Sequence, residues 1–152
     1  MSSGGSKQRV VVTNRKALRD YFIEDRLEAG LVLKGTEVKS LREGRVELAD
    51  GYVVVEGGEA WLVNTHISPW PQATYFNHEP RRRRKLLLHR HQIARLRSLL
   101  EIRGYTAVPL KIYFNERNRA KVEIGLARGK KKVDKRATIK ERDEQRQRLR
   151  ET

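Results

Sequence analysis

Residues 109–127, PLKIYFNERNRAKVEIGLA, decide the expected fold because they describe two strands joined by a short turn. Apolar side chains recur at every second position in both halves, at Leu110, Ile112, Phe114, Val122, Ile124 and Leu126. A period of two indicates a strand with one buried face. We therefore expect an antiparallel hairpin around residues 115–118. Pro109 lacks a backbone N–H, so its strand is expected to begin at a sheet edge.

Further strands are expected upstream of this hairpin. A short one spans residues 9–13, and a longer one spans residues 21–33 with a bend at Gly30. Residues 52–56 and 59–63 flank Gly57 and Gly58. A two-glycine connection suits a primed turn, so these segments are expected to form a second hairpin.

Helix signals separate the strands. Thr13 or Asn14 can cap a brief helix that runs to Arg19, and a second short helix is expected from Gly35 to Gly44, with Val38 and Leu41 on its inner face. From Gln92 to Gly104 the apolar spacing is helical, whereas the three prolines of residues 68–80 predict an irregular loop.

The predicted fold class is mainly β with helices: an OB-fold-like antiparallel barrel of about six strands, with about three helices outside. Closing a sheet into a barrel removes its exposed edges, which favours this architecture. We expect a flexible N-terminus at residues 1–8, one RNA-binding barrel at residues 9–127, and a basic tail at residues 128–152.

Charge points to a polyanionic partner. The 152 residues contain 34 Lys and Arg against 19 Asp and Glu, a formal net charge of +15. Nucleic acid is the favoured partner because closely spaced phosphates reward several cationic contacts at once. No amphipathic membrane anchor, lipidation motif, signal peptide or apolar span is visible, so no membrane is expected. The absence of cysteine excludes disulfides and fits a cytoplasmic protein.

Enzymatic chemistry finds no support. The four histidines lack metal-binding spacing and are interpreted as surface or RNA-contacting residues, and residues 125–131 fail the phosphate-loop pattern. Glu24, Asp25 and Glu28 form the one notable carboxylate group, for which pairing with neighbouring cations is the commoner explanation. We expect neither a catalytic residue, nor a metal, nor a cofactor.

Residues 80–88, PRRRRKLLL, are the strongest internal signal. The cationic run of Arg81, Arg82, Arg83, Arg84 and Lys85 is expected to stay exposed, beside a leucine run expected to be buried. We interpret it as a phosphate-contacting ridge; the alternative is a solvated charge run. Four aromatic residues can stack on bases: Trp61, Trp70, Tyr75 and Phe76. The default interpretation of each is that it anchors the core or a loop.

The tail contains too few apolar residues to form a core. Lys130, Lys131 and Lys132 are expected to contact RNA, and residues 138–141 match a helix capping box. A segment of this composition is expected to be disordered alone and to become helical on its partner. A solvated terminus without a role is the alternative.

Four blocks of the chain resemble the SsrA-binding proteins of bacterial trans-translation, the small protein B family. They are residues 14–31, 35–44, 84–89 and 125–142. The resemblance implies an adaptor that binds the tRNA-like domain of transfer-messenger RNA (tmRNA) and acts as a monomer when RNA-bound. It would enter stalled ribosomes with elongation factor Tu, its tail lying in the empty mRNA channel.

The resemblance also implies roles for particular residues. Asn14, Glu28 and Leu87 fall on the family's RNA-binding surface, with Lys85 adding charge, and Asp134, Lys135 and Arg136 match a tail motif that engages the ribosome. Two positions depart from the pattern: Val133 stands where many relatives have His, and His89 where Asn is common. A structural ribosomal protein and an RNA-processing enzyme are the competing hypotheses.

Overall fold

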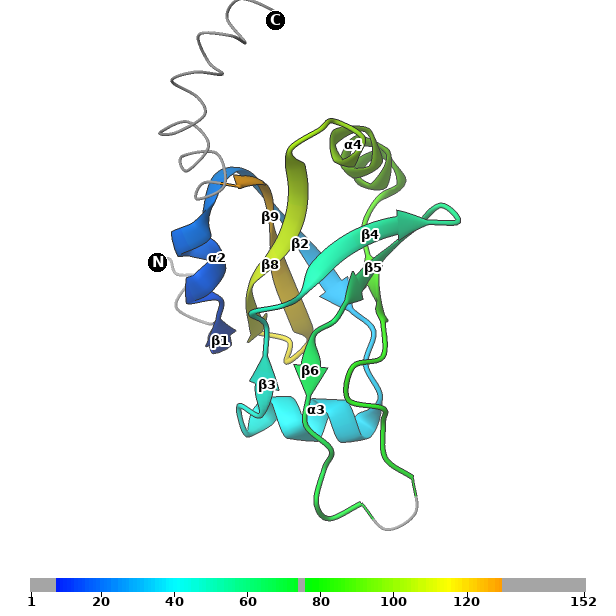
Figure 1. Ribbon diagram of the computed structural model, residues 1–152. Helices are drawn as coiled ribbons and strands as arrows, with labels where there is room; N and C mark the ends of the chain where they lie inside the picture. The colour runs from blue at the N-terminus through cyan, green and yellow to red at the C-terminus, as the bar shows by residue number, and fades with distance from the viewer. Residues whose placement is uncertain (1–7, 74–75, 130–152) are drawn as a thin grey trace, which may run out of the picture.

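The computed structural model describes residues 8–73 and 76–129, in which three helices surround a curled antiparallel sheet (Figure 1). The helices are α2 (Arg15–Asp20), α3 (Gly35–Arg42) and α4 (Arg90–Leu100). The strands are β1 (Arg9–Thr13), β2 (Tyr21–Leu31), β3 (Val46–Glu47), β4 (Tyr52–Glu56), β5 (Glu59–Val63), β6 (His66–Ile67), β7 (Arg84–Leu87), β8 (Tyr105–Phe114) and β9 (Ala120–Gly129). The mainly β class with about three outer helices is confirmed.

The sheet is open rather than closed into a barrel. Seven strands lie in the order β1-β8-β9-β2-β7-β5-β4, and β3 pairs separately with β6. Across the described residues no ladder joins the edge strands β1 and β4, so the expectation of a closed barrel is not confirmed. The β4–β5 hairpin instead crosses β8, and α4 packs on both β4 and β8 (Figure 1). The buried Leu96 of α4 belongs to the main core, so α4 packs where the β4–β5 hairpin lies against β8.

Two bulges divide the apolar side chains between two clusters. In β8 the register shifts between Pro109 and Lys111, and in β2 it shifts between Ile23 and Asp25. An extra residue reverses the face of every later side chain. Val108 and Leu110 consequently pack with Ala17 of α2, whereas Ile112 and Phe114 enter the main core. The prediction that Leu110 shares a face with Ile112 and Phe114 is therefore wrong.

Pro109 also departs from its expected place. Strand β8 begins four residues earlier, at Tyr105, and lies between β1 and β9 rather than at an edge. Proline is tolerated there because it sits at the bulge, where the ladder is interrupted. The irregularity of β2 likewise lies near Ile23 rather than at Gly30, which is the residue where β2 pairs with both β7 and β9.

Most local predictions are confirmed. Gly57 and Gly58 both have positive φ (59° and 77°), as a primed hairpin turn requires, and they join strands with the predicted bounds. Three strands were not predicted: β3 and β6 have only two residues each, and β7 begins at Arg84, the last arginine of the cationic run. Strand β9 continues to Gly129, two residues past the predicted domain boundary. The predicted tail helix and residues 1–7 of the predicted flexible N-terminus lie outside the described residues.

A buried ion-pair cluster explains the missed strand β7. Arg84 is fully buried, and its Nε donates to Glu37 Oε2 at 2.8 Å while its two other nitrogens donate to the carbonyls of Thr65 and Pro80. Arg82 donates to both oxygens of the same carboxylate, at 2.6 and 2.9 Å. The expectation that all five cations stay exposed is therefore wrong, because Glu37 of α3 compensates the buried charge of Arg84.

The Glu37 cluster predicts a specific acid sensitivity. Burial by itself would raise the pKa of Glu37, but hydrogen bonds from Arg82 and from the Lys34 N–H, with the charge of Arg84, hold it below its ordinary value of 4.5. A depressed carboxyl pKa contributes stability above the unfolded-state value, and that contribution is lost as the pH falls through the folded-state value. We expect the free energy of unfolding to fall below about pH 4.5, as measured by urea titrations at successive pH values. A Glu37→Gln variant should show a shallower decline, and an equal decline in both proteins would contradict the assignment.

Candidate nucleic-acid interface

One face of the sheet gathers three of the predicted RNA-binding residues. Strand β7 pairs with β2 through Gly30 and Leu87, and with β5 through Trp61 and Lys85. Because neighbouring residues of a strand point to opposite faces, Arg84 and Leu86 enter the core while Lys85 and Leu87 face outward. Together with Glu28 of β2 and Lys121 of β9, Lys85 and Leu87 line a hollow of about 540 Å³. We call these four residues the β7 face.

Leu87 is the apolar element of the β7 face. Its side chain is 55% exposed, so the predicted burial of the whole leucine run is wrong at this position. Leu87 packs on Gly30, where an added Cβ would lie 3.3 Å from the Leu87 side chain. Because Gly30 has no side chain, the Leu87 side chain can pack directly on the backbone of the sheet. Its exposed apolar surface can then contact a sugar or a base edge.

Glu28 is the hydrogen-bond acceptor of the β7 face. Its carboxylate accepts a hydrogen bond from the Tyr113 hydroxyl, which orients it, and the residue remains exposed. Lys121 lies across the ladder, paired in register with both Gly30 and Tyr113. A carboxylate in this hollow can accept from base amino or sugar hydroxyl groups while the lysines that line the same hollow contact phosphates.

The remaining cations of the arginine run do not form a continuous ridge. Arg81 donates to Asn64 Oδ1 at 2.9 Å, Arg83 stacks on the Trp61 ring and pairs with Glu56, and Lys85 lies 3.5 Å from Glu59. Arg84 is buried and Arg82, whose side chain is 25% exposed, is bound to Glu37, so Arg81, Arg83 and Lys85 are the more exposed cations of this run. Arg83 and Lys85 already have acidic neighbours, which a phosphate would have to displace.

Asn14 lies apart from the β7 face. It is 4% exposed, and its Oδ1 accepts from the Ala17 N–H at the start of α2. Its Nδ2 donates to the carbonyls of Pro109 (2.9 Å) and Leu48 (3.3 Å). Every polar atom of this side chain is therefore used inside the protein. The geometry favours support of α2 and of the β8 bulge over direct contact with RNA.

Replacing Asn14 tests this structural role. Asn14→Ala removes a helix cap and two buried hydrogen bonds, so we expect it to lower the free energy of unfolding by about 2–3 kcal/mol. Urea denaturation monitored by circular dichroism measures the effect, with the exposed Arg15→Ala as control. A variant of unchanged stability that loses RNA affinity would show that Asn14 contacts RNA directly.

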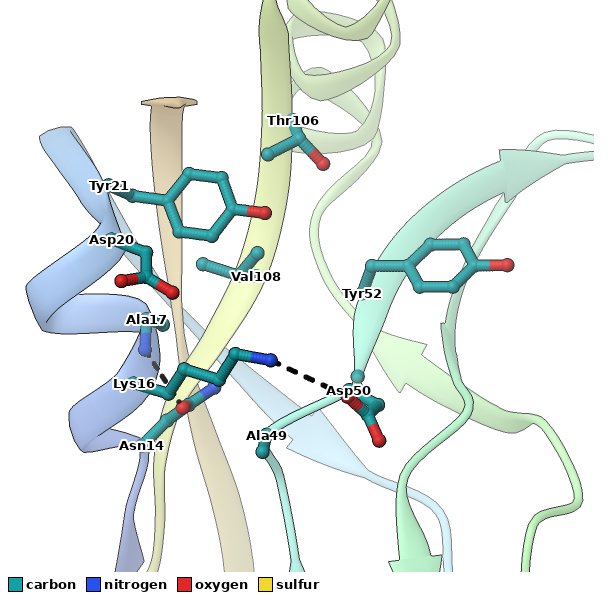
Figure 2. A pocket seen from close by; sticks show the side chains of 11 residues that line it. Asn14, Lys16, Ala17, Asp20, Tyr21, Ala49, Asp50, Tyr52, Thr106 and Val108 are labelled. Carbon is teal, nitrogen blue, oxygen red and sulfur yellow. Dashed lines mark hydrogen bonds and ion pairs between the residues drawn. The ribbon is translucent and has the colours of Figure 1, made fainter. Parts of the chain in front are cut away.

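A second hollow, of about 470 Å³, lies beside Asn14 (Figure 2). Lys16 reaches toward Asp50, with Nζ 3.9 Å from Oδ1, and the Tyr21 ring extends over Val108. Tyr21 pairs with Gly129, so the chain passes this hollow where it enters the tail. The predicted tail residues Lys130, Lys131, Lys132, Val133, Asp134, Lys135 and Arg136 lie outside the described residues.

Other candidate residues have mainly structural partners. Glu24 pairs with Arg128 and Asp25 with Arg95, which confirms the interpretation of these carboxylates; Arg95 and the Arg26 N–H lower the pKa of Asp25. His78 is buried, contrary to the expectation of surface histidines, whereas His89 and His91 are exposed and stacked. Trp61 and Trp70 are half-buried, and Tyr75 is not described. Within residues 8–73 and 76–129 no cluster could hold a metal ion, and no helix there could cross a membrane.

Tyr113, Lys121 and Glu37 were missed by sequence reasoning. The first two could have been found from the hairpin, because a turn at residues 115–118 implies that Tyr113 and Lys121 lie nearly opposite each other. Glu37 gave no such signal, since its partners Arg82 and Arg84 lie more than forty residues away.

The fold and the β7 face define a small, basic, β-rich protein of the nucleic-acid-binding class. Its exposed sheet face combines lysines, an oriented acceptor and an apolar side chain, and a strongly cationic sequence follows its last strand. The family model described as "SmpB protein" matches residues 11–152, and the chain belongs to this family.

Individual relatives are similar over almost the whole chain. The chain is 59% identical over 140 residues to an SsrA-binding protein of Leifsonia xyli, covering 92% of this chain and 88% of that protein. It is 56% identical over 153 residues to one of Agrobacterium fabrum, covering 99% and 96%. A solved structure described as "tmRNA-SmpB: a journey to the center of the bacterial ribosome" matches with TM-score 0.68 and 53% identity, covering 79% of this chain and 83% of that one.

Proposed function

We propose that this protein is an RNA-binding adaptor of trans-translation, which binds the tRNA-like domain of tmRNA and brings it to the A site of stalled ribosomes. The observation that carries the proposal is the β7 face, where Glu28, Lys85, Leu87 and Lys121 surround one hollow in a member of this family. The names of the relatives and of the similar structure supply the RNA and the ribosome. The protein acts as an adaptor, not as an enzyme.

Within this proposal the named residues have different tasks. Leu87 and Glu28 contact the RNA fold itself, while Arg81, Arg83, Lys85 and Lys121 neutralise phosphates. Arg82, Arg84 and Asn14 support the RNA-binding surface from inside the protein, because their hydrogen bonds hold β7 and the β8 bulge in place. Lys130, Lys131 and Lys132 extend the cationic surface into the tail, and Asp134, Lys135 and Arg136 engage the ribosome.

The finer features of the proposal follow from the same role. The tail occupies the empty mRNA channel and becomes helical there, and elongation factor Tu accompanies delivery of the complex. The protein is a monomer when RNA-bound and works in the cytoplasm, where ribosomes translate. Its curled sheet is a variant of the OB barrel, in which β4 lies against β8 without a ladder and α4 packs on both.

Competition binding tests the proposed function. We would measure the affinity for tmRNA against excess bulk tRNA across a salt series. Contacts specific to one RNA fold persist at high salt, whereas counterion release alone weakens steeply. We expect the preference for tmRNA to survive. If it disappears, the protein is a generic basic RNA binder, and a structural ribosomal protein becomes the better hypothesis.

Removing the tail separates RNA binding from ribosome engagement. Truncation after Gly129 leaves β9 complete, so we expect tmRNA affinity to fall by less than about tenfold, through lost phosphate contacts alone. Tagging of stalled peptides should be abolished. Gel-shift titration and a reconstituted tagging reaction provide the two measurements. A loss of most RNA affinity would make the tail a primary docking element instead.

A further inference from the structure

The loop at residues 68–80 differs in composition from the rest of the chain. Charged residues form 35% of the protein, yet residues 68–78 contain no Lys, Arg, Asp or Glu. Among the described residues of the loop, Trp70 is half-buried and Phe76 is 88% exposed, which makes Phe76 the most exposed large apolar side chain within residues 8–73 and 76–129. A single exposed apolar residue needs no explanation by itself, so the surroundings of Phe76 decide its meaning.

The base of the loop is anchored by buried hydrogen bonds. His78 is 4% exposed; its Nδ1 lies 2.8 Å from Thr36 Oγ1 and its Nε2 lies 2.8 Å from the Ile67 carbonyl. Ser40 Oγ donates to the Ser68 carbonyl at 2.6 Å, and the Ile67 N–H donates to the Pro80 carbonyl at 3.0 Å. Both ends of the loop are therefore attached to α3 and β6.

A second set of bonds closes the neck of the loop. The Trp70 N–H donates to Asn77 Oδ1 at 3.1 Å, and Asn77 Nδ2 donates to the Trp70 carbonyl at 2.8 Å. This reciprocal pair imitates a strand ladder between positions seven residues apart. Phe76 directly precedes Asn77 of this closed neck, and its ring is exposed to water.

The loop projects away from the rest of the molecule. In Figure 1 it extends beyond α3, at the opposite end from α4, whose first turn borders the β7 face. A partner that contacts Phe76 can therefore bind while the β7 face is occupied by RNA.

We propose that residues 68–73 and 76–80 form a docking loop whose Phe76 inserts into an apolar pocket of a protein in the ribosome-bound complex. Charge complementarity favours protein over RNA, because a loop aimed at a phosphate backbone would need cations and this one has none up to His78. Aromatic anchors are typical of protein–protein contacts, and a neck that is already closed by hydrogen bonds lowers the entropic cost of docking. This proposal rests on the proposed function only because its test measures the tagging of stalled peptides.

Three substitutions at position 76 distinguish the possible partners. In an apolar protein pocket leucine can replace phenylalanine, whereas arginine cannot; on an RNA base, arginine and tryptophan stack and leucine does not. We expect Phe76→Leu to retain tagging of stalled peptides within about threefold and Phe76→Arg to lower it at least tenfold. Ile102→Arg is the matched control, since Ile102 is also an exposed apolar residue but lies beyond the far end of α4. Retained activity in Phe76→Arg, or loss in Phe76→Leu with retention in Phe76→Trp, would overturn the proposal.

Crosslinking identifies the chemical class of the partner directly. The full chain with a photoreactive benzoylphenylalanine at position 76 would be bound to tmRNA and stalled ribosomes and then irradiated. We expect one adduct that resists ribonuclease and is absent when position 102 carries the probe. A ribonuclease-sensitive adduct, or none, would overturn the proposal. The Phe76 variants should bind tmRNA as tightly as the unchanged chain does. If the unchanged chain itself fails to bind tmRNA, the proposed function is wrong, and the docking loop is not the cause of that failure.

Discussion

Replacing Glu37 by glutamine is expected to lower the free energy of unfolding by about 3–5 kcal/mol. The change keeps the shape of the side chain but leaves the guanidinium of Arg84 fully buried without its counter-charge. A buried charge deprived of its partner keeps its desolvation cost and loses the compensating attraction. An effect of this size is a large part of the stability of a domain this small.

Urea unfolding followed by the fluorescence of Trp61 and Trp70 measures the loss. Glu43→Gln is the matched control, because it makes the same chemical change on an exposed residue just after α3 and is expected to alter stability by less than about 0.5 kcal/mol. Adding Arg84→Met to Glu37→Gln should recover part of the loss, since the unpaired charge is removed. A loss below about 1 kcal/mol in Glu37→Gln would mean that the carbonyls of Thr65 and Pro80 suffice to hold Arg84.

Replacing Leu87 by aspartate is expected to lower the affinity for tmRNA by about 100-fold, which corresponds to about 2.7 kcal/mol. The substitution removes the apolar contact of the β7 face and adds a negative charge that phosphates repel. Because Leu87 is 55% exposed, the midpoint of thermal unfolding should change little. Gel-shift titration and a thermal melt separate these two effects.

The control for Leu87 is Ile102→Asp. Ile102 is 52% exposed, so the same change is made at matched exposure beyond the far end of α4. Salt dependence adds a second criterion: Leu87→Ala should leave the slope of log affinity against log salt unchanged, whereas Lys85→Gln should reduce it by about one. If Leu87→Asp and Ile102→Asp weaken binding equally, the β7 face is not the specific site. If Leu87→Asp unfolds the protein, Leu87 is a structural residue.

The local elements follow from patterns that lie within short windows of the sequence. Strand-like segments at residues 9–13 and 21–33 predicted β1 and β2, alternation predicted the hairpin of β8 and β9, and the two glycines predicted the turn between β4 and β5. Thr13 or Asn14 was predicted as a cap, and the structure selects Asn14, whose Oδ1 accepts from the Ala17 N–H. Such signals are local because strand periodicity, caps and turns each depend on residues a few positions apart.

The candidate site was only partly predictable, for the same reason. Glu28 and Leu87 were named through family resemblance and Lys85 through the cationic run of residues 81–85, and the structure places all three around one hollow. Asn14 was named with them, yet its bonds to Leu48 and Pro109 place it inside. Nothing in its neighbouring residues distinguishes an asparagine that contacts RNA from one that supports a bulge, because its partners come from distant segments.

By itself the sequence determined the β-rich class, most strand and helix positions, the basic character and the family. The tertiary structure alone decided which arginine is buried, where the bulges reverse the faces of β2 and β8, and that the sheet remains open under α4. The physical reason is that these outcomes depend on long-range compensation. Arg84 is buried in the core only because it forms an ion pair there with Glu37, which lies 47 residues away in the sequence. No local sequence pattern predicts that pairing.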